Sequence, residues 1–574
     1  MSRPVRFGLI RTEGVFRQWE AECLSRLTAL PSVALAAVIV PVHSPAGKSP
    51  AGQAWPSSWL IRRAQRGAWG PAHASRHLSA APELRCRITH DSAGQGIAGP
   101  DVSTIEAQNL DFLLAFGGER WSGKVLAAAR WGLWAFRYTG QPGSADAPPG
   151  FWEVCLEEPT TSAALVVLSD DPAGDPILKD GFVSTAGRSY TANAATISLE
   201  AAAWPAQVCA CVEAGSTVVK GRRRLPRAGT GPPVRIRDLP RLVLGTLRTR
   251  WRQFADRNLY ADLWNVGVVR APIERFLEPG YRPIVEWFPV PRPGTFRADP
   301  FGLTRDGRVT VLFEDFDYRQ DLGRIAAVEL GKSADYQSGA VAIGPPVHLS
   351  YPYVFERGGE VLCVPETYQA REVGLYRADE FPTRWSKVAT LIGGVPALDA
   401  TVFQHGDRWW LACAMQGSTE RSHLHLYHAP DLLGPWTSHL GNPVKIDIGS
   451  GRPGGTPFVH AGVLYRPAQD ASGTYGGRVV INRVTVLTPI EFDEEPAAVV
   501  GPLLDSPYPD GLHTLSTAGG ITLVDAKRVV LMTNPAVRAG LRPWLKQRLR
   551  HALTIARRSG RRQAVSQERS PELH

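Results

Sequence analysis

Long apolar runs are absent from this sequence. No window approaches the stretch of about 18 uninterrupted apolar residues that suggests a membrane-spanning helix. The chain passes from Met1 into the strand-like segment Phe7 to Ile10 without the apolar core of a secretory signal. We therefore expect no membrane span, and a cytoplasmic protein that could associate peripherally with a membrane.

Cysteine spacings typical of metal sites or disulfide frameworks are also lacking. The seven cysteines are odd in number, scattered, and mostly set within apolar runs. Zinc sites and disulfide frameworks need paired or closely spaced cysteines. We therefore expect reduced, structural thiols, and predict neither a metal site nor a cofactor.

A nucleic-acid-binding surface is not expected, although the net charge is +10. Most of the excess lies in three segments, Lys220 to Arg227, Arg235 to Arg252 and Arg538 to Arg562. Aromatic residues do not interleave with these arginines as a single-strand-binding surface requires. The basic segments are better explained as solvated chain or as contacts with an anionic membrane.

What the sequence does contain is a repeated phrase typical of β-structure. Asp299-Pro-Phe-Gly-Leu leads through a glycine turn into an apolar strand ending at Glu314, and similar copies begin near residues 351, 399, 455 and 513. A period of roughly 50 residues is in the range of propeller blades. We predict an all-β five-bladed propeller over residues 262–535. The first residue of each copy should face the axis, so that Asp299 and Asp399 can meet.

The first 219 residues predict a different fold. A strand over Phe7 to Ile10, an amphipathic segment from Arg17 to Leu30, and an apolar run from Val33 to Val40 give a βαβ start. This order indicates a doubly wound α/β domain with a parallel sheet. At 574 residues the chain is long enough for several domains.

Two basic segments flank the predicted propeller. Residues 220–261 read as a linker followed by a helix from Arg241 to Asp262, in which apolar residues recur at helical spacing: Leu244, Leu247, Trp251 and Phe254. We expect this helix to pack against one of the two domains, with membrane contact as the alternative. Residues 536–574 form a basic tail that is either solvated or lies on an anionic membrane.

The first domain carries phrases of a known superfamily. Gly132-Leu-Trp-Ala-Phe-Arg-Tyr, Pro148-Pro-Gly-Phe-Trp-Glu and Gly174-Asp-Pro-Ile-Leu make it resemble the amino-terminal domain of methionyl-tRNA formyltransferases. The catalytic Asn and His of that family are replaced by residues around Arg137. The resemblance therefore implies the fold without the activity, and Arg137, Glu153 and Asp171 are the candidates for a retained ligand site.

The predicted propeller resembles a second family. Arg297-Ala-Asp-Pro-Phe, His348-Leu-Ser-Tyr-Pro, Arg452-Pro-Gly-Gly and Tyr465-Arg-Pro-Ala-Gln-Asp are similar to the amino-terminal propeller of plant glucosamine inositolphosphorylceramide transferases and their bacterial relatives, and distantly to five-bladed glycosidases. The plant enzymes are assigned their sugar transfer in a separate carboxyl-terminal domain. The resemblance implies a carbohydrate-active protein that acts on a glycan or glycolipid precursor, in surface-polysaccharide biosynthesis.

Cleavage of a glycosidic bond needs two carboxyls, one acid and one base or nucleophile. By resemblance, Asp299 is the candidate base or nucleophile; Glu366 is the candidate acid, because its apolar strand should raise its pKa. Asp399 would orient or tune this pair. The candidates for binding sugar hydroxyls or a substrate anion are Arg297, His348, Arg452, Arg466 and Asp470.

Three functions remain open on the sequence alone. The propeller could be a glycosidase- or transferase-type enzyme with Asp299 and Glu366 as its working carboxyls. It could instead hold a glycan without cleaving it, because Glu366 precedes Asp399 whereas the glycosidases have the opposite order. The first domain could transfer a formyl or other acyl group to an amino sugar, although its missing Asn and His argue against this.

Overall fold

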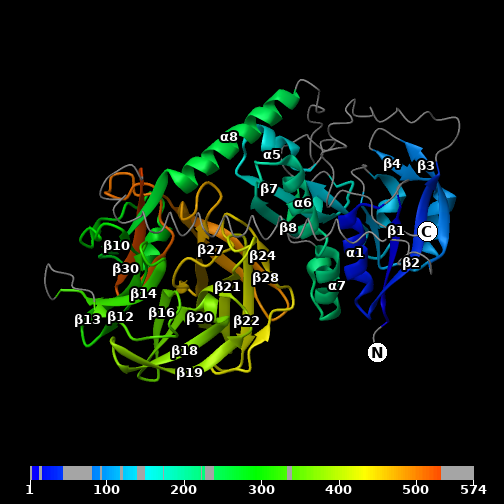
Figure 1. Ribbon diagram of the computed structural model, residues 1–574. Coiled ribbons are helices and arrows are strands. Elements are labelled where there is room, and N and C mark those ends of the chain that lie inside the picture. Colours follow the sequence, from blue (N-terminus) through cyan, green and yellow to red (C-terminus); the bar gives the residue numbers. More distant parts are fainter. Residues whose placement is uncertain are drawn as a thin grey trace, which may run out of the picture.

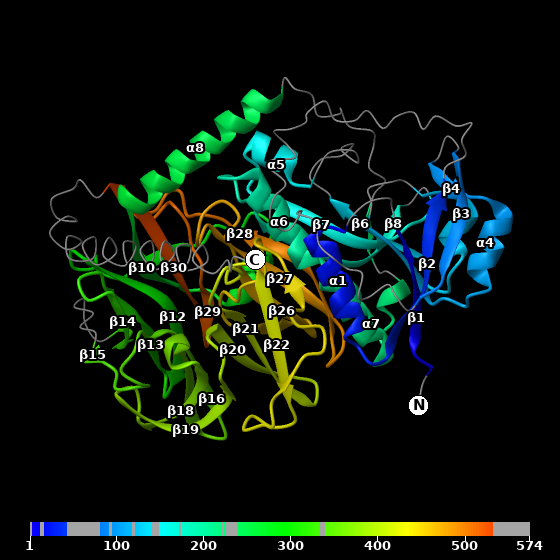
Figure 2. The ribbon, with the colours of Figure 1, turned by 45° about the vertical axis from the view of Figure 1, so that its right-hand side comes forward.

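The computed structural model describes residues 3–11, 16–42, 81–90, 94–116, 121–138, 149–171, 174–220, 223–225, 238–331 and 339–531. An α/β domain lies beside a β-propeller, and the long helix α8 (Leu239–Asn258) runs diagonally across one side of both (Figure 1, Figure 2). The predicted tail at 536–574 and part of the linker lie outside the described residues.

The α/β domain is built on one nine-stranded sheet with the order β4-β3-β2-β1-β5-β6-β7-β8-β9. The strands from β3 to β6 in this order run parallel, whereas β4 and the strands from β7 onward are antiparallel to their neighbours. The sheet is therefore mixed rather than wholly parallel. Its strands are β1 (Val5–Ile10), β2 (Val33–Val42), β3 (Glu83–His90), β4 (Gln95–Ile97), β5 (Phe112–Ala115), β6 (Leu133–Tyr138), β7 (Thr160–Val167), β8 (Asp175–Ser184) and β9 (Arg224–Leu225).

Helices cover both faces of this sheet. Alternate residues of β1 point to opposite faces, so that Phe7 and Leu9 join one core and Ile10 the other. The first core is closed by α1 (Gln18–Thr28), α6 (Tyr190–Ala201) and α7 (Trp204–Glu213), and the second by α4 (Gly99–Glu106) and the short helix η1 (Gly123–Ala127). Another helix of this domain, α5 (Phe151–Leu156), contacts α8. The predicted α/β class is confirmed.

The propeller has five blades, as the repeat predicted. Its sheets have the strand orders β12-β13-β14-β15, β16-β17-β18-β19, β20-β21-β22-β23 with β24 added to β22, β25-β26-β27-β28, and β11-β10-β30-β29. Their bounds are β10 (Tyr260–Val269), β11 (Val285–Trp287), β12 (Thr295–Arg305), β13 (Arg308–Asp317), β14 (Leu322–Glu329), β15 (Gly339–Ala340), β16 (Ser350–Arg357), β17 (Glu360–Glu366), β18 (Glu372–Glu380), β19 (Arg384–Gly393), β20 (Ala397–His405), β21 (Arg408–Met415), β22 (His423–Ala429), β23 (Thr437–Ser438), β24 (Lys445–Ile446), β25 (Phe458–His460), β26 (Val463–Asp470), β27 (Arg478–Leu487), β28 (Phe492–Val500), β29 (Leu515–Ala518) and β30 (Ile521–Leu531).

The fifth blade closes the ring by combining strands from both ends of the propeller. β10 pairs antiparallel with β30 from Tyr260 opposite Leu531 to Val269 opposite Thr522. The faint fifth copy of the repeat near His513 corresponds to β29, the turn at Gly519 and β30. Closing the ring by pairing its first and last strands removes the exposed edges that an open sheet would have.

A β-bulge at the start of three inner strands explains the repeated phrase. The pairing register shifts between Ala298 and Phe301 in β12, and equivalent shifts occur in β16 and β20. The bulged residues Asp299, Tyr351 and Asp399 have positive φ angles of 51°, 43° and 52°. Side chains other than glycine adopt this conformation rarely, and such outliers cluster at functional sites. The first residue of the first three copies thus sits in a backbone conformation that side chains rarely adopt.

The two domains share packed side chains. Ile446 of β24 is buried in the first core of the α/β domain, together with Trp204 of α7. Phe182 of β8 forms an isolated parallel bridge with Asp447, and the Ile448 N–H donates to the Phe182 carbonyl at 2.8 Å. The propeller edge at β24 therefore docks on the last long strand of the α/β sheet.

Candidate functional site

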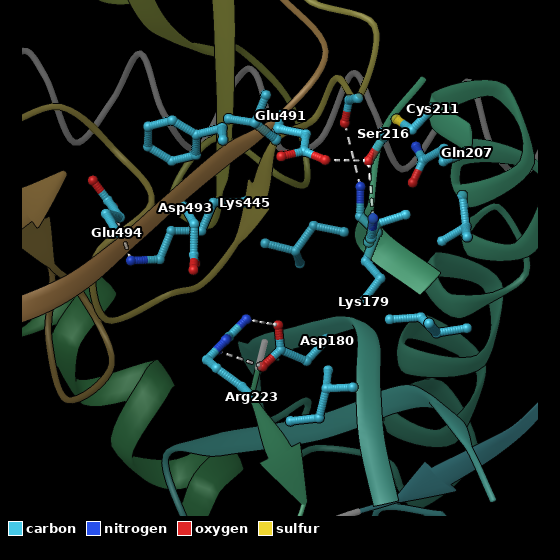
Figure 3. A pocket seen from close by; sticks show the side chains of 18 of the residues that line it. Lys179, Asp180, Gln207, Cys211, Ser216, Arg223, Lys445, Glu491, Asp493 and Glu494 are labelled. Atoms are coloured by element: carbon cyan, nitrogen blue, oxygen red, sulfur yellow. Dashed lines mark hydrogen bonds and ion pairs between the residues drawn. The ribbon is translucent and has the colours of Figure 1, made fainter. Parts of the chain in front are cut away.

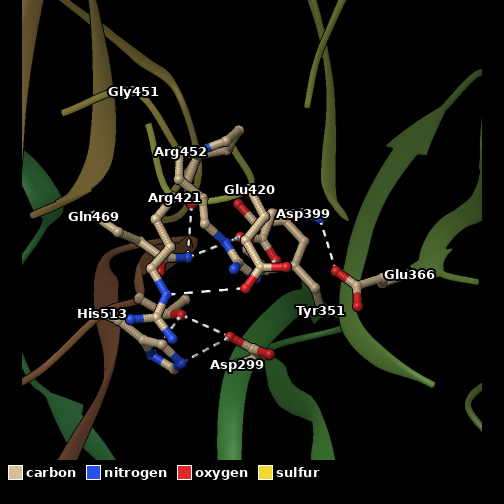
Figure 4. Close-up of polar contacts among 12 residues, drawn as sticks. Asp299, Tyr351, Glu366, Asp399, Glu420, Arg421, Gly451, Arg452, Gln469 and His513 are labelled. Atoms are coloured by element: carbon tan, nitrogen blue, oxygen red, sulfur yellow. Dashed lines mark hydrogen bonds and ion pairs between the residues drawn. The ribbon is translucent and has the colours of Figure 1, made fainter. Parts of the chain in front are cut away.

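A cavity of about 210 Å³ lies at the propeller axis, where the inner strands begin (Figure 4). Four acidic side chains converge on it from three different blades. It is lined by Trp264, Phe296, Ala298, Asp299, Glu314, Phe316, His348, Ser350, Glu366, Asp399, Arg452, Tyr475 and His513.

Blade symmetry explains how the two glutamates reach the axis. Glu314 of β13 pairs with Ala298, and Glu366 at the end of β17 pairs with Ser350, so the two occupy equivalent positions in their blades. Each of these partners lies directly before a bulged residue, Asp299 or Tyr351. Successive blades therefore deliver a carboxyl to the same level of the axis.

Asp399 is held firmly by two neighbours. Arg452 donates to both of its carboxylate oxygens, with Nη2 at 3.2 Å from Oδ1, and Gln469 Nε2 donates to Oδ2 at 2.8 Å. The backbone N–H of Asp399 donates to Oε2 of Glu366 at 2.8 Å. The bulge at Asp399 thus links the carboxyl groups of two adjacent blades (Figure 4).

Asp299 has a different set of partners. Thr514 Oγ1 donates to its Oδ1 at 2.9 Å, and Nε2 of His513 lies 3.7 Å from the same oxygen. Its backbone N–H donates to Oδ2 of Asp525 at 2.9 Å, an oxygen that also lies 2.8 Å from Nδ1 of His513. Asp299, His513 and Asp525 offer oxygen and nitrogen atoms that all lie within 4.8 Å of one another. Within the described part of the chain, these three side chains form a group that could hold a metal ion.

Burial raises the pKa of the axial carboxyls. The pKa of Glu366 rises to about 8, because burial disfavours its charge and the Asp399 carboxylate adds repulsion. Burial raises the pKa of Asp299 to about 6, against the opposing effect of His513. The pKa of Glu314 rises well above its ordinary value, through burial and then the charges of Asp299 and Glu366. Near neutral pH, Glu366 is thus mainly protonated and Asp299 mainly ionised.

Aromatic rings form part of the cavity wall. Trp264 stacks on His513 with ring centroids 4.1 Å apart, and Tyr475 meets both rings edge-on. The guanidinium of Arg452 lies 5.5 Å from the Tyr475 ring centroid. Aromatic rings beside polar groups are suited to packing against the apolar face of a sugar.

The structure gathers five of the residues predicted for the propeller site and separates three. Asp299, Glu366, Asp399, His348 and Arg452 line the axial cavity. The three others do not line it.

Those three residues have local partners. Arg466 pairs with the buried Glu494 and donates to the Ser450 carbonyl at 2.7 Å. Asp470 accepts from Arg478 Nε at 2.7 Å. Arg297 donates to the Pro289 carbonyl at 3.1 Å. These contacts describe structural roles, and a role in binding substrate stays a prediction for each.

The candidates in the first domain have separate local surroundings. Arg137 lies 3.6 Å from Asp175, Asp171 pairs with Arg224 at 2.8 Å, and Glu153 is buried within α5, where burial raises its pKa. None of the three lines the axial or the interdomain cavity. A ligand site built from them remains a prediction.

Sequence reasoning missed several residues of the axial cavity, among them Glu314, His513, Tyr475 and Trp264. Glu314 could have been found, because it follows Asp299 by 15 residues, as Glu366 follows Tyr351. His513 could also have been found, because the fifth copy of the repeat begins near it, whereas Tyr475 and Trp264 carry no such signal. His513 and Tyr475 reach the axis from loops, and Trp264 reaches it from β10, the third strand of the closing blade counted from the axis.

A second and larger cavity, of about 420 Å³, lies between the domains (Figure 3). Two of its ion pairs join charged groups of the lining: Arg223 binds Asp180 through Nη1 and Nη2, and Lys445 binds Glu494 at 2.9 Å. Lys179 donates to two propeller carbonyls, and Glu491 accepts from Ser216 at 2.6 Å. These contacts satisfy the domain interface, whereas the axial cavity keeps carboxyls beside carboxyls.

Comparison with known proteins adds a family to this geometry. Residues 288–501 match the family described as glucosamine inositolphosphorylceramide transferase 1, N-terminal. Glucosamine inositolphosphorylceramide transferase 1 of Oryza sativa subsp. japonica is 35% identical over 210 residues, which are 36% of this chain and 28% of that protein. The protein of the same name from Arabidopsis thaliana is 32% identical over 211 residues, 35% of this chain and 27% of its own. The chain therefore spans little more than a quarter of the curated relatives it matches.

Solved structures with partial likeness include two glycosidases. Zg3597, a family 117 glycoside hydrolase from Zobellia galactanivorans, has 14% identity and a TM-score of 0.31, covering 46% of this chain and 90% of its own. An α-L-arabinofuranosidase from Lactobacillus brevis has 14% identity and a TM-score of 0.28, covering 37% and 80%. The family match lies within the propeller, so it confirms that resemblance and gives the formyltransferase resemblance of residues 1–219 no support.

Proposed function

We propose that the propeller is a carbohydrate-active module that binds a glycan or glycolipid precursor at its axis and acts on a glycosidic bond. The observation that carries the proposal is that two carboxyls of one cavity differ in protonation near neutral pH, with the pKa of Glu366 about 8 and that of Asp299 about 6. Carboxyls whose pKa values are pushed apart can divide acid and base roles. The family match of residues 288–501 supports the substrate class.

In this proposal Glu366 is the acid and Asp299 the base or nucleophile. Protonated Glu366 would donate its proton to the leaving glycosidic oxygen. Ionised Asp299 would take a proton from water or attack the anomeric carbon. Asp399, fixed by Arg452 and Gln469, would hold Glu366 through its backbone N–H and keep its pKa raised by repulsion.

The test is turnover of a panel of aryl glycosides and of a glycosyl inositolphosphoryl lipid by the full chain. Asp299→Asn and Glu366→Gln should each lower kcat by about 100- to 10,000-fold, the range for removal of general acid–base groups. The pH profile of kcat/KM should rise near pH 6 and fall near pH 8, and Glu366→Gln should remove the falling limb. Aryl glycosides with a good leaving group should be less sensitive to Glu366→Gln, since they need less protonation.

A matched control is Glu360→Gln, which changes an exposed glutamate at the other end of β17, paired with Arg377. It should leave turnover unchanged, and thermal unfolding should show that all variants fold. Unchanged turnover in both axial variants would falsify the catalytic proposal.

A second function, glycan binding without cleavage, is favoured by one observation. The Glu366 carboxyl already accepts the Asp399 N–H, and both carboxylate oxygens of Asp399 accept hydrogen bonds from Arg452 or Gln469. Such contacts also suit a rigid binding site. Glycan-array binding that survives both substitutions, with no product by mass spectrometry, would favour this reading.

A further inference from the structure

The helix α8 exposes an apolar stripe on the side that faces away from the protein. Trp251, Phe254 and Leu247 are 65%, 52% and 55% exposed, and Leu244 and Val243 are exposed as well. Their spacing of three and four residues places these side chains on one face of the helix. The helix α8 has 20 residues and is about 30 Å long, so its exposed apolar side chains form a continuous patch rather than isolated apolar residues.

Close backbone contacts fix which face points outward. A Cβ atom at Gly245 would lie 2.8 Å from the Val154 carbonyl of α5, and one at Gly187 would lie 2.9 Å from Thr249. Leu242 packs against the cluster formed by Phe151, Trp152 and their neighbours. The helix is therefore seated through small and short side chains, and it cannot rotate to bury its tryptophan without losing this fit.

Arginines flank the exposed stripe. The helix contains five arginines and one aspartate, and Arg241, Arg248, Arg250 and Arg252 are exposed. Arg248 and Arg252 share the single carboxylate of Glu157, at 3.4 and 3.0 Å. The surface around the stripe thus keeps a positive charge.

From this arrangement we propose that α8 docks the protein on an anionic lipid surface, with the apolar stripe among the acyl chains and the arginines at the headgroups. Helices that lie in a membrane interface combine an apolar face containing Trp, Phe or Leu with a basic polar face. A second copy of the chain fits less well, because pairing two stripes would bring their arginines together. The inference does not rest on the chemistry at the propeller axis. Within the described residues no helix is long and apolar enough to cross a membrane, so the contact is peripheral.

The helix α8 lies next in the chain to a strand that forms part of the axial cavity. Only Leu259 separates the end of α8 from β10, whose Trp264 lines the axial cavity. Figure 2 shows α8 running along one side of the molecule down to β10 and β30. A lipid surface held by α8 would therefore lie beside the strand that forms one wall of the cavity.

The test is co-sedimentation of the full chain with phosphatidylcholine vesicles and with phosphatidylcholine–phosphatidylglycerol vesicles. Wild type should bind the anionic vesicles and not the neutral ones, and added salt should weaken binding by screening the arginines. The triple change Leu247→Gln, Trp251→Gln and Phe254→Gln should lower partitioning by about tenfold or more, because the apolar contact is lost.

The matched control changes three apolar residues of the propeller region that are even more exposed than the stripe, Ile284→Gln, Val290→Gln and Leu504→Gln. It should leave partitioning unchanged. The proposal would be overturned if the wild-type protein bound neither kind of vesicle, or if the triple stripe variant bound as well as wild type. It would also be overturned if light scattering showed a wild-type dimer that dissociates in the triple stripe variant. Equal binding would assign the contact to another segment, such as the basic tail.

Discussion

The axial cavity and the interdomain cavity each bury a propeller glutamate near an arginine, yet the pKa values of the two glutamates are shifted in opposite directions. At the interdomain cavity Glu494 receives hydrogen bonds from Arg466 and from Lys445, and these cations hold its pKa below the ordinary value in spite of burial. At the axis the guanidinium of Arg452 is bound to Asp399, so Glu366 is left beside a carboxylate and its pKa rises.

The difference shows that burial alone does not identify a functional carboxyl. Glu494 and Glu366 are both almost inaccessible, but two cations pair with Glu494, whereas Arg452 pairs with Asp399 rather than with Glu366. A paired charge is a structural contact, whereas like charges kept together in a cavity are costly and are typical of sites. This contrast, more than cavity size, favours the axis as the working site.

The largest expected effect comes from breaking the structural pair. Arg466→Met should lower the free energy of unfolding by about 3–5 kcal/mol, because Glu494 would keep a buried charge with one cation fewer. Arg483→Met is the matched control, since Arg483 pairs with Glu495 on an exposed surface and should cost about 1 kcal/mol or less. Denaturant unfolding measures both. Equal losses would mean that burial does not strengthen the Glu494 contacts, and the comparison would fail.

A smaller effect, of opposite sign at the two cavities, is expected from neutralising the glutamates. Glu366 has an unfolded pKa of 4.5 and a folded pKa of about 8, so the folded state holds its proton more tightly. Its contribution to stability is therefore present below pH 4.5 and is lost as the pH rises toward 8. Glu366→Gln should remove this loss, and at pH 8 the variant should equal or exceed wild type by about 1 kcal/mol.

Glu494 behaves in the reverse way. Its lowered pKa contributes stability above pH 4.5 that is lost as the pH falls through the folded value. Glu494→Gln should therefore be destabilised at neutral pH, and its deficit should shrink in acid. Unfolding curves at several pH values measure both variants. If the two followed the same pH trend, the assignment of one cavity to structure and the other to chemistry would be wrong.

Part of this site was predictable from the sequence. The repeat placed Asp299 and Asp399 at the axis, because a period of about 50 residues indicates blades and blades share an axis. It could not separate Arg452 from Arg466, which lie on either side of the start of the fourth copy. Arg452 comes from the loop before β25 and reaches Asp399, whereas Arg466 lies within β26 and faces Glu494. That choice depends on the path of a loop, which periodicity does not encode.

The helix α8 gives the same lesson for packing. Apolar spacing predicted a helix over Arg241 to Asp262, and the structure has one over Leu239–Asn258. The expectation that this helix packs against a domain is confirmed by its contacts with α5, but Gly245 and Thr249 make the close contacts, whereas Trp251 of the stripe is exposed. Amphipathic spacing identifies a face, but the shape of the partner surface decides which face is buried.

The smallest expected effect lies at the mouth of the interdomain cavity. Arg223 binds Asp180 through two hydrogen bonds of 2.9 and 3.0 Å, but its side chain is 56% exposed, so water screens the pair. A double-mutant cycle with Arg223→Gln and Asp180→Asn should give a coupling free energy of about 0.2–1 kcal/mol in denaturant unfolding. The same cycle on Arg466 and Glu494 should give a severalfold larger coupling, because that pair is fully desolvated. A coupling free energy of similar size in the two cycles would mean that burial does not strengthen ion pairs at the interdomain cavity. The contrast with the axial cavity would then depend only on the cluster of carboxyls at the axis.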